Sequence, residues 1–219
     1  MIGESLKRIE DPALLRGKGT FVDDIHLAGM LQAAFLRSPH PHALIKSIDT
    51  EAAMLAPGIR AIFTLADFLP YIVEGRLPLQ FPTADFRPDV TPWLLAGDEV
   101  CYVGEVVALV IADTRYQAED AMVLVEVDYE PLPSVSGCAA AFADDAPLVH
   151  RDTTDNVLVR FQQSYGDTDA AFADAPYKFR ERFVQHRGAA HPIEGRGAVG
   201  RYDALDDAIT LWSSTQMSH

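Results

Sequence analysis

The sequence predicts an α+β protein of 219 residues, and three observations carry that prediction. Hydrophobic residues make up 48% and charged residues 23%, a globular balance with enough apolar mass for a core. Fourteen glycines and fourteen prolines favour turns and strands over a helix bundle. Residues 99–133 read as two β-rich runs broken at Gly104, then a helix and a strand, and this order is typical of a compact α+β domain.

The first 64 residues alternate strands with short connections. Residues 1–29 are irregular, and the elements expected after them are strands over 30–37 and 43–49, a helix over 50–58, and a strand over 58–64. The prolines of S-P-H-P-H separate the first two strands because proline breaks a β-ladder. Thr50 is expected to cap the helix, and Pro57 and Gly58 to end it.

The middle of the chain contains the best-defined unit. Residues 68–97 form a proline-rich loop without a sustained period, and such long loops are usually functional. Thr114 and Gln117 have the spacing of a capping box at the start of a helix. One face of that helix is apolar, with members at spacings of three and four: Ala118, Ala121, Met122 and Val125. A strand follows and closes at Pro131 and Pro133.

The last third of the chain has strand patterns but little core of its own. The expected elements are strands over 156–166 and 177–188, a helix over 167–175, and a hairpin of 197–204 with 208–214 joined at 205–207. Ser213, Ser214 and Thr215 are residues that usually cap a helix, so another helix is expected to begin there. This part resembles an unfinished domain because strand edges need partners.

Charge and composition exclude several classes of protein. The formal net charge of −14 and a pI of about 4.7 repel a phosphate backbone, so no nucleic-acid partner is expected. The polar start carries no secretory signal, and the longest apolar run, 106–112, is too short to span a membrane. Cys101 and Cys138 lie outside any metal-spaced set and are expected to be free thiols. These features predict a soluble, cytoplasmic protein without an iron–sulfur cluster of its own.

Several polar groups have residue types that can form sites, but structural roles are favoured for all of them. His40 and His42 could chelate a metal from one side of a strand, but no third ligand lies at a zinc-like spacing, and a rigid turn explains the stretch. The glycines of G-K-G and G-R-G fit no phosphate-binding pattern. Turn or structural roles are likewise favoured for the remaining candidates: Asp23–Asp24, Asp206–Asp207, His186, His191 and Glu194.

Two long stretches carry a family resemblance. Residues 17–64 contain G-K-G-T-F-V-D-D-I, R-S-P-H-P-H-A and a P-G-I turn, and residues 100–135 run from V-C-Y-V-G-E-V to Y-E-P-L-P-S-V. Shorter matches are G-D-T-D-A-A-F-A-D-A, P-I-E-G-R-G-A-V-G-R-Y-D and L-W-S-S-T-Q-M-S-H. Together they resemble the molybdenum-binding large subunit of the xanthine dehydrogenase and aldehyde oxidase family, in its carbon monoxide dehydrogenase-like branch. Small departures are Val106 where the family has proline, and P-I-E-G-R where it often has P-M-E-P-R.

The resemblance implies a domain plan and one cofactor contact. The plan is a lead-in over 1–15, an α/β-hammerhead domain over 16–135, a connector over 136–149, and the incomplete start of a molybdopterin-binding α+β domain over 150–219. The glutamine of S-T-Q in the family hydrogen-bonds an oxygen ligand of molybdenum, and here it is Gln216. No catalytic and no metal-ligating residue is expected in this chain, because the family's glycine-rich loop and catalytic glutamate come later.

The resemblance also implies an activity and partners. The chain would be the N-terminal portion or a split subunit of a molybdenum hydroxylase that oxidises an aldehyde, heterocycle or similar small substrate with oxygen from water. Molybdopterin would bind in the complete assembly with the rest of the large subunit, and iron–sulfur clusters and FAD would be carried by partner domains or subunits. The 219 residues alone are expected to be inactive and free of cofactor. The alternatives are a non-catalytic hammerhead module that docks on iron–sulfur or flavin subunits, and an unrelated ligand-binding α+β domain.

Overall fold

The computed structural model describes residues 3–79, 83–186, 188 and 191–215. The chain divides into two compact units: Leu31–Ala171, and Met1–Met30 together with Phe172–His219. The first unit combines two sheets with helices, and the second contains a hairpin, so the predicted α+β class is confirmed. Within the described ranges, no helix combines the length and apolar character that a bilayer crossing needs.

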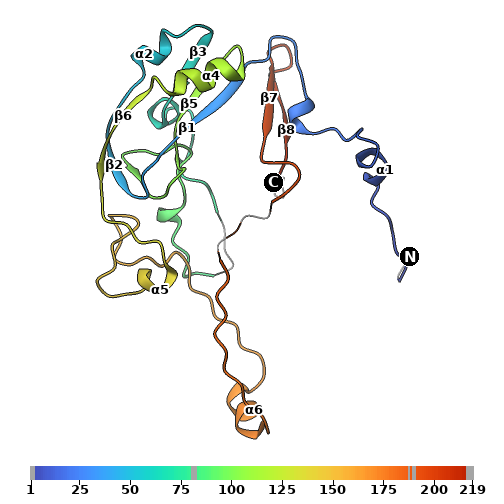
Figure 1. The fold of residues 1–219 in the computed structure, drawn as a ribbon, viewed down its shortest axis with the longest axis vertical. Coiled ribbons are helices and arrows are strands. Elements are labelled where there is room, and N and C mark those ends of the chain that lie inside the picture. Colours follow the sequence, from blue (N-terminus) through green and yellow to red (C-terminus); the bar gives the residue numbers. More distant parts are fainter. Residues whose placement is uncertain (1–2, 80–82, 187, 189–190, 216–219) are drawn as a thin grey trace. The chain divides into compact units, whose positions relative to one another are not determined.

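The first sheet of the larger unit is antiparallel and has the order β1-β5-β3, with β1 at Gln32–Arg37, β5 at Val106–Ala112 and β3 at Ile59–Phe63 (Figure 1). Its central strand β5 is buried on both faces, which explains why the sequence there is a continuous apolar run rather than an alternation. The buried members of β5 are Val107, Ala108, Val110 and Ala112.

Helix α4 (Arg115–Met122) covers this sheet with small side chains. Ala118 and Ala121 are fully buried and belong to the same core cluster as Val110. Thr114 Oγ1 accepts the Gln117 N–H at 3.3 Å, so the predicted N-cap is confirmed. Thr114 Oγ1 also donates to Gln117 Oε1 at 2.9 Å. In the expected capping box, the Gln117 side chain would instead accept the backbone N–H of Thr114.

The second sheet has the order β4-β2-β6, with β4 at Glu99–Val100, β2 at Ala43–Asp49 and β6 at Glu126–Pro131, again antiparallel. Its core cluster contains Val107 of the first sheet, and Ile48 and Val127 pack against the core clusters of both sheets. The two sheets therefore share one continuous apolar interior.

The helix expected over 50–58 is shorter and is capped differently. Helix α2 spans Glu51–Met54, and the Thr50 side chain makes no cap bond; Asp49 Oδ1 instead accepts the Glu51 N–H at 2.9 Å. Thr50 occupies the N-cap position as predicted, but its side chain does not cap the helix. Gly58 has a φ of +78°, and an added Cβ would lie 2.2 Å from Gln117 Nε2, so glycine is needed at this turn.

The proline-rich loop after β3 is held by specific contacts rather than regular structure. It begins after helix α3 (Leu65–Phe68) and contains the short 3₁₀ helix η2 (Pro88–Val90). The Arg76 guanidinium lies 4.3 Å from the centre of the Trp93 ring and donates to the Thr91 carbonyl. These contacts anchor the described part of the loop to itself.

The expected strands over 156–166 and 177–188 are wrong. Within 156–166 only Val159 forms a bridge, to Phe86, and the described part of 177–188 carries no strand. Tyr177, Phe179 and Phe183 alternate as predicted, but all three are at least 80% exposed. An alternating pattern forms a strand only where another strand completes its ladder, and the described residues offer none here.

The helix and hairpin predicted for the C-terminal part are confirmed. Helix α6 spans Thr168–Asp174, and strands β7 (Ala198–Asp203) and β8 (Ala208–Ser213) pair in register from Ala198 opposite Ser213 to Asp203 opposite Ala208. Asp207 adopts a left-handed φ of +47° in the connecting turn, which aspartate tolerates better than most residues. The remaining helices are α1 (Asp11–Leu14), η1 (Val22–Asp24) and α5 (Cys138–Ala141).

Candidate functional site

The C-terminal hairpin ends in a serine clamp. Ser214, directly after β8, donates from Oγ to the Gly195 carbonyl at 2.8 Å and accepts the Gly197 N–H at 2.8 Å. Its own N–H donates to the Gly197 carbonyl at 3.1 Å. Three bonds therefore tie the end of β8 to the turn before β7, two residues ahead of Gln216.

Glu194 and Gly197 join this clamp to the N-terminal segment around Val22. Glu194 Oε1 accepts the Val22 N–H at 2.9 Å, a contact of the structural kind expected for this residue. A Cβ on Gly197 would lie 3.3 Å from Val22 Cγ1, a close approach that favours glycine. Val22 opens η1, which Asp24 closes by accepting the Phe21 N–H at 2.9 Å. Residues far apart in sequence thus support one end of the hairpin.

The predicted cofactor contact Gln216 lies outside the described residues. So does most of the helix expected to begin at Ser213–Thr215; Ser214 and Thr215 are described and have no regular structure. The role of Gln216 stays a prediction.

The two histidines of S-P-H-P-H have separate partners. His42 is 5% exposed, with Nδ1 2.8 Å from the Pro133 carbonyl and Nε2 3.1 Å from Glu99 Oε1. Because a carbonyl oxygen can only accept, Nδ1 donates to Pro133, and Nε2 faces Glu99 Oε1. The His40 ring instead lies 4.9 Å from that of Tyr129. This arrangement supports the structural turn that was favoured over a chelating pair.

Glu99 is the centre of a polar cluster that sequence reasoning missed. Its Oε1 accepts from Cys101 Sγ at 3.4 Å and from the Arg151 N–H at 3.3 Å, in addition to the His42 contact. Cys101 Sγ also lies 3.3 Å from His150 Nδ1. The only local signal is the E-V-C spacing, which puts two side chains on one side of an extended segment. His150 comes from a loop 49 residues away.

Burial dominates the electrostatics of this cluster. Burial, with the charges of Glu99 and Glu105, raises the pKa of the Cys101 thiol far above its usual range, so the free thiol is neutral. Burial also lowers the pKa of His150 and raises the pKa of Glu105. A protonated, half-buried thiol is a poor nucleophile, which argues against covalent chemistry at Cys101.

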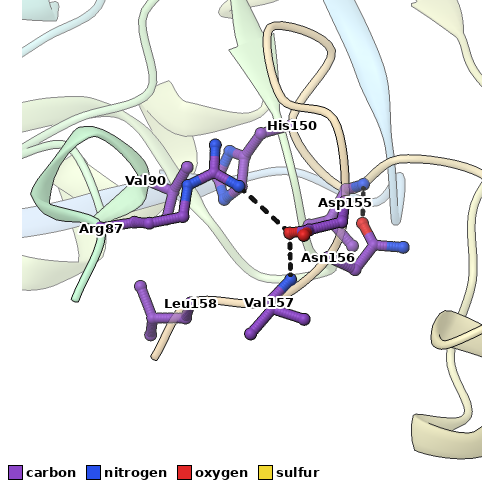
Figure 2. A pocket seen from close by; sticks show the side chains of 8 residues that line it. Arg87, Val90, His150, Asp155, Asn156, Val157 and Leu158 are labelled. Atoms are coloured by element: carbon purple, nitrogen blue, oxygen red, sulfur yellow. Dashed lines mark hydrogen bonds and ion pairs between the residues drawn. The ribbon is translucent and has the colours of Figure 1, made fainter. Parts of the chain in front are cut away.

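A cavity of about 200 Å³ adjoins the cluster at His150 (Figure 2). Arg87 Nη1 lies 3.2 Å from Asp155 Oδ1, and the same carboxylate oxygen accepts the Val157 N–H at 3.0 Å. That N–H, with help from Arg160 and Arg87, lowers the pKa of Asp155. The other lining residues are Val90, Val149, His150, Asn156 and Leu158.

Replacing Ser214 with alanine is expected to lower the free energy of unfolding by about 1–2 kcal/mol, because the Gly197 N–H and the Gly195 carbonyl each lose a partner. Urea denaturation of the two proteins measures the difference. The matched control is Ser213→Ala, since Ser213 is an exposed neighbour whose loss is expected to cost less than about 0.5 kcal/mol. Equal losses for the two variants would contradict a clamp at Ser214.

Two family models match the chain in sequence order. Residues 16–133 match the aldehyde oxidase and xanthine dehydrogenase a/b hammerhead domain, and residues 149–219 match the molybdopterin cofactor-binding domain. These matches agree with the resemblance seen in the motifs and with the predicted fold.

Individual relatives are similar over the whole chain. The nicotine 6-hydroxylase large subunit of Paenarthrobacter nicotinovorans is 40% identical over 100% of this chain and 26% of its own length. The carbon monoxide dehydrogenase large chain of Afipia carboxidovorans is 39% identical over 100% of this chain and 28% of its own. The crystal structure of quinoline 2-oxidoreductase from Pseudomonas putida 86 aligns with a TM-score of 0.84 and 36% identity, covering 98% of this chain and 27% of that one. The chain therefore spans about a quarter of the length of these relatives.

Proposed function

Because this chain belongs to the aldehyde oxidase and xanthine dehydrogenase family, we propose that it provides the hammerhead domain and the first part of the molybdopterin-binding domain of a molybdenum hydroxylase. The complete enzyme would oxidise an aldehyde, an aromatic heterocycle or a similar small substrate with oxygen from water. The observation that carries this proposal is the ordered pair of domain matches, the second of which includes the hairpin before Gln216.

The residues at the end of the hairpin suit a cofactor held by hydrogen bonds. Ser213, Ser214 and Thr215 are short and polar, and the Gly195–Gly197 turn brings backbone close to them. When bound, the molybdenum cofactor would supply the redox chemistry, and protein groups would orient it and tune its charge.

In this proposal Gln216 donates a hydrogen bond from its side-chain amide to the cofactor. A neutral amide can do so without adding charge to the site. Ser214 would act as a positioning residue because its three bonds fix the backbone two residues earlier. Such fixed backbone ahead of Gln216 would reduce the ordering needed when the cofactor binds.

The partners would be the remaining molybdopterin-binding part of the large subunit and subunits or domains that carry iron–sulfur clusters and FAD. Several large apolar side chains in the C-terminal part are exposed, and their burial against a partner would be favourable. They are Tyr177, Phe179, Phe183, Val184, Ile209 and Leu211. The two free thiols fit a cytoplasmic assembly, where cysteines stay reduced.

The experiment that tests this function is purification of the protein with its native partners, followed by intact mass and molybdenum measurements. We expect an assembly that contains about one molybdenum per copy of this sequence and that reduces a dye with an aromatic aldehyde or an N-heterocycle as substrate. A 24.0 kDa chain that purifies without molybdenum, alone or on iron–sulfur subunits, would overturn the proposal. That result would favour the non-catalytic docking module.

A further inference from the structure

The cluster around Glu99 presents three different metal-ligand types at one point. The nearest ligand atoms of Glu99, Cys101 and His150 all lie within 4.8 Å of one another. Cys101 Sγ is 3.4 Å from Glu99 Oε1 and 3.3 Å from His150 Nδ1. A tetrahedral zinc ion with its usual bond lengths places a sulfur about 3.5 Å from a neighbouring nitrogen or oxygen ligand. The two spacings from the sulfur are therefore already close to those of an occupied site, and the Glu99 and His150 ligand atoms lie within 4.8 Å of each other.

We propose that Glu99, Cys101 and His150 form a binding site for a divalent zinc-type cation, with water as the fourth ligand. Carboxylate, thiolate and imidazole are the three side-chain ligand types that Zn²⁺ takes in proteins. The function proposed above uses none of these three residues, so this proposal does not depend on it.

Surrounding groups hold two of the three ligands in place. His42 Nε2 and the Arg151 N–H both contact Glu99 Oε1, so this carboxylate is oriented by partners that are not ligands. Glu105 Oε2 accepts the Cys101 N–H at 2.6 Å and fixes the backbone that carries the thiol. Glu99 is the first residue of the paired strand β4, and its side chain is only 12% exposed. The sheet therefore positions Glu99 and, two residues later, Cys101, and a loop brings His150 to them.

A metal-free hydrogen-bond network satisfies this cluster less well. The Cys101 thiol has one hydrogen, and it faces both a carboxylate oxygen at 3.4 Å and a ring nitrogen at 3.3 Å. Sulfur–hydrogen groups are weak donors, so neither contact gains much from the proton. A cation replaces that proton and is coordinated by all three atoms together. Arg76 and Arg151 add positive charge nearby, which Glu99 and Glu105 offset.

Cobalt titration of the full 219-residue chain tests the site, since Co²⁺ takes zinc sites and gives a visible spectrum. We expect one equivalent to produce tetrahedral d–d bands with a thiolate charge-transfer band, all removed by Zn²⁺. Cys101→Ser should abolish the thiolate band, and Glu99→Gln or His150→Ala should weaken binding at least about 10-fold. Cys138→Ser is the matched control, because Cys138 is exposed and outside the cluster, and it should leave the spectrum unchanged.

A second measurement needs no variant and so does not depend on how the substitutions fold. Alkylation of each cysteine is followed by peptide mass with and without Zn²⁺. At a zinc concentration ten times Kd, alkylation of Cys101 should slow about 10-fold because only the metal-free fraction reacts. Alkylation of Cys138 should not change. Equal Co²⁺ spectra for Cys101→Ser and Cys138→Ser, or unchanged Cys101 alkylation in zinc, would overturn the proposal.

Discussion

Replacing His42 with alanine is expected to lower the free energy of unfolding by about 2–4 kcal/mol. The ring is buried between the Pro133 carbonyl and the Glu99 carboxylate. The His42 side chain is 6% exposed and the Glu99 side chain is 12% exposed. Removal of the ring leaves a cavity, a carbonyl without its donor, and a buried carboxylate with one partner fewer. The loss stays at the lower end of the range expected for a broken buried pair because Arg151 still contacts Glu99. Urea denaturation in the presence of a chelator measures the effect without any metal contribution.

His40→Ala is the matched control, since both histidines come from the same turn. His40 is partly exposed and its ring makes a tilted contact with Tyr129, so its loss is expected to cost about 0.5–1.5 kcal/mol. The His42 ring joins the start of β2 to Glu99 of β4 and to Pro133 just after β6. Equal losses of stability for the two substitutions would contradict this role.

The elements that sequence alone predicts well are those whose causes are local. The Thr114 hydroxyl caps α4 from three residues away, and Ala118 and Ala121 lie on one face by helical spacing. The hairpin of β7 and β8 is likewise fixed by adjacent segments and a short turn. In each case the residues that stabilise an element are within a few positions of it.

The features that sequence alone misses depend on distant partners. Tyr177 and Phe179 alternate with polar residues as in a strand. A strand forms only where a second strand pairs with it, and the local sequence pattern does not show whether that second strand is present. The Glu99–Cys101–His150 cluster joins residues 49 positions apart, and only the E-V-C spacing hints at it. Thr50 occupies the N-cap position of α2, but the Asp49 carboxylate, and not the Thr50 hydroxyl, accepts a first-turn N–H.

The candidate cofactor contact has a different basis again. Gln216 follows from the S-T-Q motif within a family resemblance and not from spacing or periodicity, because a single glutamine after a strand has no chemical signature of its own. The structure adds the Ser214 clamp just before it, a feature that the motif alone does not reveal. The physical argument for Gln216 is therefore that it follows the Ser214 clamp by two residues in the sequence. Its role has to be tested by measuring activity.

Gln216→Ala in the assembled enzyme is expected to lower kcat about 10²–10³-fold, the usual effect of removing one pre-organised hydrogen-bond donor from charge that develops in a transition state. Dye reduction with the best aldehyde or heterocycle substrate measures kcat, and the molybdenum content of each preparation shows whether the cofactor is retained. KM should change far less than kcat, because the contact proposed for this amide is with the cofactor and not with the substrate.

Two further variants separate hydrogen-bond donation from simple loss of packing. Gln216→Glu keeps the size of the side chain but replaces the donor with a charged acceptor, so kcat should fall at least as far as in Gln216→Ala. Gln163→Ala removes an exposed glutamine elsewhere in the chain and should leave kcat unchanged. Full molybdenum content with kcat within about twofold of the unaltered enzyme in Gln216→Ala would refute the assigned role, since a twofold change is under 0.5 kcal/mol.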